Sequence, residues 1–191
     1  PPVYGISRPA RTRNPFKINF QHLWIMVKDA WRSEYLIDKI TIWFRPTGWR
    51  PKGFDEKYPV QKIDDVYDFE KYKPKISKSI LYWSIGHLFI VMFFLMDLFA
   101  RIGELPINEV FVYGIYIFLT IYSLTDLMDQ NRWNWLLEVS RTVMVIFIGF
   151  WIGDWFGHYL ALYFVVTYQA IALLISFQQR KEYSQNTEIV Y

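Results

Sequence analysis

The chain has 191 residues, of which 53% are hydrophobic and 20% aromatic, and these shares are higher than an ordinary soluble domain carries. It contains no cysteine, which excludes disulfides, thiolate metal sites and thiol nucleophiles. The first residue is proline, and no signal-peptide pattern follows it, so we expect a fragment or a processed chain.

Two amphipathic helices are predicted within residues 1–51. Asn14 followed by Pro15 is a helix-start signal, and one face of the first helix then carries apolar side chains, namely Phe20, Trp24, Val27 and Trp31. Ser33 is expected to cap the second helix, whose apolar residues are Leu36, Ile37, Ile40, Trp43 and Phe44. Helices of this kind suit a membrane interface. The alternative is that their apolar face packs on another part of the same protein.

The stretch FRPTGWRP, residues 44–51, follows the second helix. Pro46 is expected to end that helix, and Thr47-Gly48 to supply the turn. Tryptophan and arginine side chains favour the boundary between lipid and water. The expected interfacial anchors are Trp24, Trp31, Trp43, Trp49 and Arg50. A phosphate site formed by Arg45 and Arg50 is the alternative.

Residues 52–78 mix acidic and basic residues with tyrosine and phenylalanine, and they predict a charged cytoplasmic linker. Because its acidic residues nearly cancel its lysines, the linker gives no indication of nucleic-acid binding.

Residues 79–178 are predicted to form a module of four transmembrane helices, with residues 179–191 as a cytoplasmic tail. Its uncharged or nearly uncharged runs are 80–100, 110–125, 142–153 and 159–177. A bilayer core requires about 20 apolar residues of helix, with a range of about 17–25, so the first and last runs are long enough and the other two are borderline. Buried helices of a soluble bundle are the alternative. The predicted fold class is therefore all-α and integral to the membrane.

The distribution of lysine and arginine predicts the orientation. Sixteen of the 21 basic residues lie within residues 1–78, and Arg180 and Lys181 directly follow the last run. Because positive residues favour the cytoplasmic side, we expect four spans with both termini in the cytoplasm.

Polar residues inside the predicted spans are the candidates for function, because charges are costly there. His87 is either a ligand or proton carrier, or a neutral histidine bonded to a neighbouring helix. Glu138 and Arg141 are three residues apart and are expected to neutralise each other. A spacing of four predicts a smooth strip for helix packing on one helix, formed by Gly149, Gly153 and Gly157.

Asp126, Asp129 and Arg132 follow one another at intervals of three near the end of the second span. Paired carboxylates hold metals or move protons, whereas an acid-to-arginine ladder would be structural. The possible functional polar residues are thus His22, His87, Asp126 and Asp129. Scattered histidines do not supply a metal centre, so we assign no catalytic, cofactor-binding or metal-binding residue to this chain.

Three stretches carry a family resemblance, namely residues 4–24, YGISRPARTRNPFKINFQHLW, the FRPTGWRP stretch, and residues 125–133, TDLMDQNRW. They resemble the C-terminal part of sterol desaturase and fatty acid hydroxylase superfamily proteins, in the branch with alkylglycerol monooxygenase and its bacterial relatives. The resemblance implies a parent enzyme in which histidine clusters hold two irons, activate dioxygen and oxidise a lipid. Those clusters would precede this segment, and His22 matches none of them.

The resemblance implies that this segment anchors the parent protein, gives access from the lipid and supports its upstream catalytic domain. Tetrahydrobiopterin is the reductant of alkylglycerol monooxygenase, but no residue here indicates its use. Two other functions remain open from the sequence, namely a self-contained membrane scaffold and, motivated by His87 and the intramembrane glycines, a small transporter.

Overall fold

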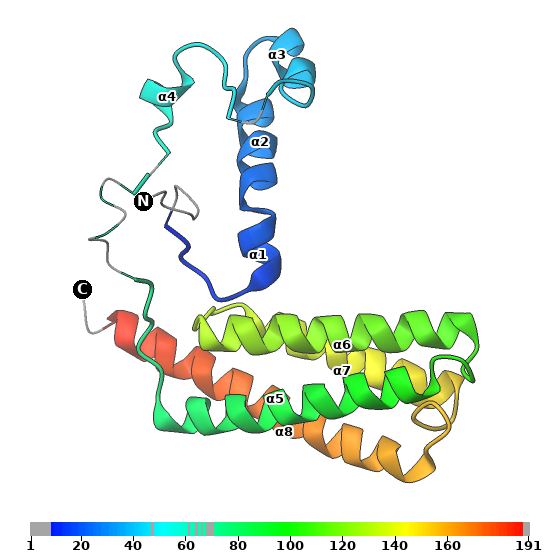
Figure 1. Cartoon of the computed structure of the whole chain (residues 1–191). Coiled ribbons are helices and arrows are strands. Elements are labelled where there is room, and N and C mark those ends of the chain that lie inside the picture. Colours follow the sequence, from blue (N-terminus) through cyan, green and yellow to red (C-terminus); the bar gives the residue numbers. More distant parts are fainter. Residues whose placement is uncertain are drawn as a thin grey trace. The chain divides into compact units, whose positions relative to one another are not determined.

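The computed structural model describes residues 9–188, except residues 47, 61, 64, 66 and 68–70, and it describes side chains as far as Lys181. In the described part of the chain all regular structure is helical, with eight helices and a single isolated bridge between Trp155 and His158 (Figure 1). The predicted all-α class is confirmed. The chain divides into two compact units, residues 1–73 and 74–191.

The described residues of the first unit form four short helices: α1 (Pro15–Asn19), α2 (Gln21–Arg32), α3 (Leu36–Thr41) and α4 (Phe54–Lys57). The side chain of Asn14 caps α1, because its Oδ1 accepts hydrogen bonds from the backbone N–H groups of Phe16 at 3.0 Å and Lys17 at 3.2 Å. Pro15 occupies the first turn, where its missing N–H costs nothing. The predicted helix start is confirmed.

Two expected helix boundaries are wrong. Ser33 does not cap α3. Its backbone N–H bonds to the carbonyl of Asp29 at 3.0 Å and thereby closes α2, while Tyr35 precedes α3. Pro46 does not end α3 either, because this helix already ends at Thr41. Pro46 instead begins a turn, in which its carbonyl accepts the N–H of Trp49 at 3.0 Å and Gly48 has a φ of +89°. Thr47 lies outside the described residues.

The second unit is a bundle of four long helices (Figure 1): α5 (Lys78–Arg101), α6 (Ile107–Met128), α7 (Asn134–Trp151) and α8 (Tyr159–Glu188). Consecutive helices pack on each other. Each predicted apolar run lies within one of these helices, except for the end of the third run, which extends past α7. α8 continues through most of the residues expected to form the tail.

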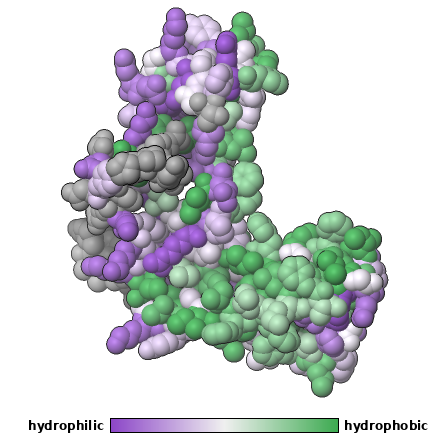
Figure 2. Space-filling view, viewed as in Figure 1, coloured by the Kyte–Doolittle hydropathy of each residue, from purple (hydrophilic) through white to green (hydrophobic). Residues whose placement is uncertain are grey.

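Among the described residues, three helical segments are long and apolar enough to cross a membrane: Lys78–Arg101, Ile107–Met128 and Tyr159–Lys181. Most of their residues face outward, and Figure 2 shows hydrophobic side chains covering much of the bundle surface. α7 is not among these candidate membrane-spanning helices. It has 18 residues, or about 27 Å of helix at 1.5 Å per residue, and it carries buried Glu138 and Arg141. The chain is an integral membrane protein, and four spans is an approximate count.

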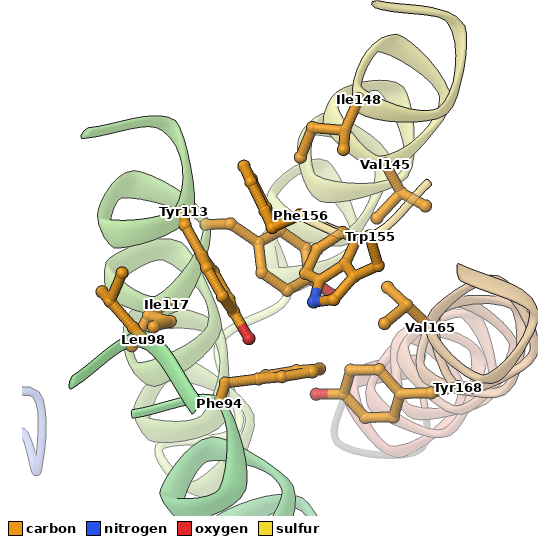
Figure 3. Close-up of a cluster of buried hydrophobic side chains, with 11 residues drawn as sticks. Phe94, Leu98, Tyr113, Ile117, Val145, Ile148, Trp155, Phe156, Val165 and Tyr168 are labelled. Carbon is orange, nitrogen blue, oxygen red and sulfur yellow. The ribbon is translucent and has the colours of Figure 1, made fainter. Parts of the chain in front are cut away.

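The core of the bundle is aromatic (Figure 3). Its centre is filled by Trp155 and Phe156, which come from the connection between α7 and α8 and are 1% and 0% exposed. Around them pack Phe94 of α5, Tyr113 of α6 and Tyr168 of α8, with ring centroids between 4.5 and 6.2 Å apart. Offset and edge-to-face contacts of this kind stabilise beyond simple burial.

The predicted glycine strip is wrong. α7 ends at Trp151, so Gly153 and Gly157 lie in the connection to α8, where their φ values are +88° and +92°. Only Gly149 is helical, and a Cβ placed there would lie 3.7 Å from Cδ2 of Leu162 on α8. The two later glycines permit the backbone to turn, which returns Trp155 and Phe156 into the core.

Candidate functional site

A buried polar network lies inside the bundle of the second unit, and it starts from an ion pair on α7. Nη1 of Arg141 lies 2.8 and 2.7 Å from the two carboxylate oxygens of Glu138. The side chains of these residues are 0% and 3% exposed, respectively. The expected mutual neutralisation is confirmed, because the two charges cancel within one helical turn.

Helices on both sides of α7 supply further donors to the Glu138 carboxylate. The hydroxyl of Ser123 on α6 donates to one oxygen, and the amide of Gln169 on α8 donates to the other at 2.8 Å. Ser123 also lies 3.1 Å from Oδ1 of Asn134 at the start of α7. Paired and hydrogen-bonded in this way, the carboxylate is tolerated away from water.

The other end of the Arg141 guanidinium meets two tyrosines. Its Nη2 donates to the hydroxyl of Tyr168 at 3.0 Å and more weakly to that of Tyr116 at 3.4 Å. The guanidinium carbon also lies 5.3 Å from the ring centroid of Tyr116 and 5.4 Å from that of Tyr168. Cation–π attraction to both rings adds to the ion pair with Glu138.

His87 completes the network from α5. Its Nε2 lies 2.9 Å from the hydroxyl of Tyr168, and the histidine is 1% exposed. Trp83, one turn earlier on α5, packs edge-on against the imidazole at 5.9 Å and stacks on the Tyr168 ring at 6.0 Å. The network therefore joins side chains from all four helices of the bundle.

A second polar cluster lies where α5 ends. Arg101 donates to Asp97 on the same helix and to the backbone carbonyl of Phe156. The hydroxyl of Tyr113 donates to Asp97 at 2.9 Å, and Nε2 of His158 lies 3.5 Å from the same carboxylate. This cluster fastens the α7–α8 connection to α5 and α6. Sequence reasoning missed it, because Arg101 and Phe156 are 55 residues apart and Asp97 and His158 are 61 residues apart.

The acidic candidates do not lie in a ladder along one helix. α6 ends at Met128, so Asp129 and Arg132 lie beyond it. Asp126 is buried and accepts a hydrogen bond from the amide of Asn131 at 2.7 Å. His22 is half-buried on α2. Among the described residues no group of three histidine, aspartate or glutamate side chains is placed to hold a metal ion.

The first unit has its own charged centre, at Arg50. The guanidinium lies 2.6 and 3.0 Å from the two carboxylate oxygens of Asp29, 2.9 Å from Asp55, and 2.8 Å from the carbonyl of Tyr58. The hydrogen bond to Asp29 raises the pKa of Arg50. Arg50 was expected among the interfacial anchors, which stays a prediction; its guanidinium is bonded to these partners within the first unit. Its role is to tie the FRPTGWRP stretch to α2.

The tryptophans expected as anchors differ in exposure. Trp24, Trp31 and Trp43 are 59%, 87% and 44% exposed. Trp49 is half-buried, and the Arg45 guanidinium lies 5.4 Å from its ring centroid. Within the first unit, Trp24, Trp31 and Trp43 thus belong to an apolar surface that the unit itself does not cover.

Together, the apolar helices and the charge-neutral network define an all-helical integral membrane protein. Its curated relatives include alkylglycerol monooxygenases. The chain is 26% identical over 148 residues to the enzyme of Xenopus tropicalis and 23% identical over 150 residues to that of Homo sapiens. Each match covers 76% of this chain and 33% of the relative, so the chain spans about a third of the length of the curated relatives it matches. This similarity supports the expected link to that family. No family model and no solved structure matches the chain.

Proposed function

We propose that this chain is the C-terminal membrane portion of an iron-dependent, dioxygen-using lipid oxidoreductase of the sterol desaturase and fatty acid hydroxylase type. The observation that carries the proposal is the similarity to alkylglycerol monooxygenases, which extends over 76% of this chain but only 33% of theirs. The described residues of this chain contain three candidate membrane spans, and a segment of this kind is suited to anchoring a protein in the bilayer.

In this proposal the catalytic iron ligands belong to an upstream domain of the same protein, and the described residues of this chain supply none of them. The bundle would hold the protein in the bilayer, with the network around Glu138 and Arg141 fixing how its helices pack. Membrane lipids are the proposed partners of the outward apolar side chains, and both termini are proposed to lie in the cytoplasm.

The described helices of the first unit would lie at the membrane surface. Trp24, Trp31 and Trp43 offer the exposed indole rings for that position, and Arg50 holds the turn that follows them. The alternative partner of these three tryptophans is the upstream catalytic domain, whose surface would then cover their side chains.

The test is to express the longest reading frame that contains this chain in membranes and measure its metal and activity. The expected result is about two irons per protein, as the resemblance implies, and dioxygen-dependent oxidation of an alkylglycerol or a related lipid. The chain alone, purified in detergent, is expected to carry no stoichiometric iron. A long reading frame without histidine clusters, or iron bound tightly by the chain alone, contradicts the proposal.

A further inference from the structure

We propose that Tyr168 and His87 form a redox site, at which Tyr168 gives up one electron while its hydroxyl proton moves to Nε2 of His87. The two atoms are 2.9 Å apart, and the residues are 3% and 1% exposed. The inference goes beyond the proposed function and does not rest on it, because the oxidant in the test below is supplied from outside.

The hydrogen bonds at the Tyr168 oxygen direct its proton toward the histidine. Arg141 only donates, so the bond from its Nη2 at 3.0 Å occupies a lone pair of that oxygen. The phenol O–H then needs an acceptor, because a buried donor is rarely left without one. Nε2 of His87 is the basic atom within hydrogen-bond distance. A neutral imidazole whose Nε2 faces the phenol is the group to which that proton can move.

Arg141 contacts this pair and Glu138 pairs with Arg141, and both charged residues come from α7. Their charges cancel through the contacts at 2.7 and 2.8 Å. The neighbours on α5 and α6 that touch the pair or share its arginine are uncharged, namely Trp83, Tyr116 and Thr120. The pair is therefore neutral before oxidation. One positive charge remains afterwards, on the imidazolium of His87 beside a neutral tyrosyl radical.

Aromatic rings pack on Tyr168 from two sides. Trp83, which is half-buried, stacks on Tyr168 at 6.0 Å with an interplanar angle of 23°. In the other direction Phe94 lies 6.2 Å from Tyr168, and Trp155 follows Phe94 at 5.7 Å (Figure 3). Electrons thus have a route of closely spaced aromatic rings to a phenol that solvent does not reach.

The electron and proton balance is simple. A one-electron oxidant of high potential, such as a photogenerated ruthenium(III) polypyridyl complex, takes one electron and becomes ruthenium(II). Tyr168 loses that electron and breaks its O–H bond, and His87 gains the proton at Nε2. When the radical is reduced again, the proton returns from His87 to the phenol oxygen.

The experiment uses the full chain in lipid nanodiscs. Ruthenium tris-bipyridine is photo-oxidised by a cobalt(III) acceptor, the sample is frozen, and the radical is recorded by electron paramagnetic resonance. A neutral tyrosyl signal is expected, with a component that is lost in Tyr168→Phe and in His87→Leu. Tyr116→Phe is the matched control and should keep that component, because its hydroxyl meets the same arginine but an amide instead of an imidazole. Tyr113, which donates to Asp97 at 2.9 Å, is expected to contribute to the remaining signal.

Circular dichroism and size-exclusion profiles identify a variant that fails to fold. Tyr168→Phe removes the phenol that is oxidised, and His87→Leu removes the proton acceptor. If one variant fails to fold, the other still tests the proposal. The proposal is overturned if no tyrosyl signal forms in the unaltered chain, or if Tyr168→Phe leaves the spectrum and yield unchanged. It is also overturned if His87→Leu keeps the Tyr168 component, or if Tyr116→Phe removes it. None of these outcomes bears on iron binding by the longer protein.

Discussion

Arg50 and Asp29 are 21 residues apart in the chain, yet Nε of Arg50 lies 2.6 Å from the Asp29 carboxylate, and Nη2 lies 3.0 Å from its other oxygen. This two-point contact explains why FRPTGWRP contains an arginine after its turn. The planar guanidinium matches both oxygens of a carboxylate on α2, which a lysine would not do.

Replacing Arg50 with lysine is expected to loosen the first unit. The loss of the two-point contact and of the bond to the Tyr58 carbonyl should cost about 1–3 kcal/mol, the range for leaving buried polar groups poorly paired. Hydrogen exchange of the backbone amides in α2 and α4 would report this as faster exchange. Arg45→Lys is the matched control, because Arg45 is exposed and contacts the face of Trp49. Equal exchange in the two variants would show that the contact with Asp29 is not important.

Removing Glu138 is expected to destabilise the bundle far more than removing a lipid-facing residue. Glu138→Ala leaves the Arg141 cation buried without its anion, and breaking a buried pair in this way costs about 3–5 kcal/mol. Thermal unfolding in detergent measures the loss. The double variant Glu138→Met with Arg141→Met should recover much of it, because no charge is then left buried. Additive losses in the double variant would contradict a shared pair.

Gly149 and Gly157 are expected to respond in opposite ways to alanine. Gly157 has a φ of +92°, and a Cβ there would lie 3.4 Å from Nη1 of Arg101, so Gly157→Ala should cost about 1–2 kcal/mol. Gly149 is helical, and its Cβ would make an ordinary contact with Leu162 at 3.7 Å. Gly149→Ala should therefore be neutral or stabilise by up to about 1 kcal/mol. Thermal unfolding of the two variants measures these changes in stability. If the three glycines formed a continuous packing strip on one helix, Gly149→Ala would instead be the more destabilising change.

Trp31 tests the proposed position of the first unit at the membrane surface. In nanodiscs that contain lipids brominated near the headgroup, tryptophan emission should be quenched, and Trp31→Phe should remove part of the quenched component because this ring is 87% exposed. Trp155→Phe is the control, because that ring is 1% exposed in the bundle core. If Trp31 is not quenched, the apolar surface of the first unit is covered by protein instead of lipid.

The positions of the helices could be predicted from the sequence, because each long helix contains most or all of a nearly uncharged apolar run and Asn14-Pro15 is a local start signal. The helix ends were harder. The Gly153–Gly157 segment has a spacing of four that also fits a helix face, but it contains the turn signal of a glycine followed by aspartate. That signal was available and would have indicated a loop.

The buried network could be predicted only in part. Glu138 and Arg141 are neighbours on one helix, so their pairing follows from a spacing of three. The contacts of His87 with Tyr168 and of Glu138 with Gln169 join residues 81 and 31 positions apart, and they depend on how the helices pack. A tyrosine or glutamine within an apolar run carries no local signal of its partner.

The central claim is that lipid surrounds the bundle formed by α5 to α8. The most direct test is to express the full chain in cells and wash the membranes at high pH with sodium carbonate, followed by detergent. The chain is expected to stay in the membrane pellet through the carbonate wash and to be released only by detergent, because its long helices expose apolar side chains on their outer faces. Recovery of folded, monodisperse chain in the carbonate supernatant would contradict the claim.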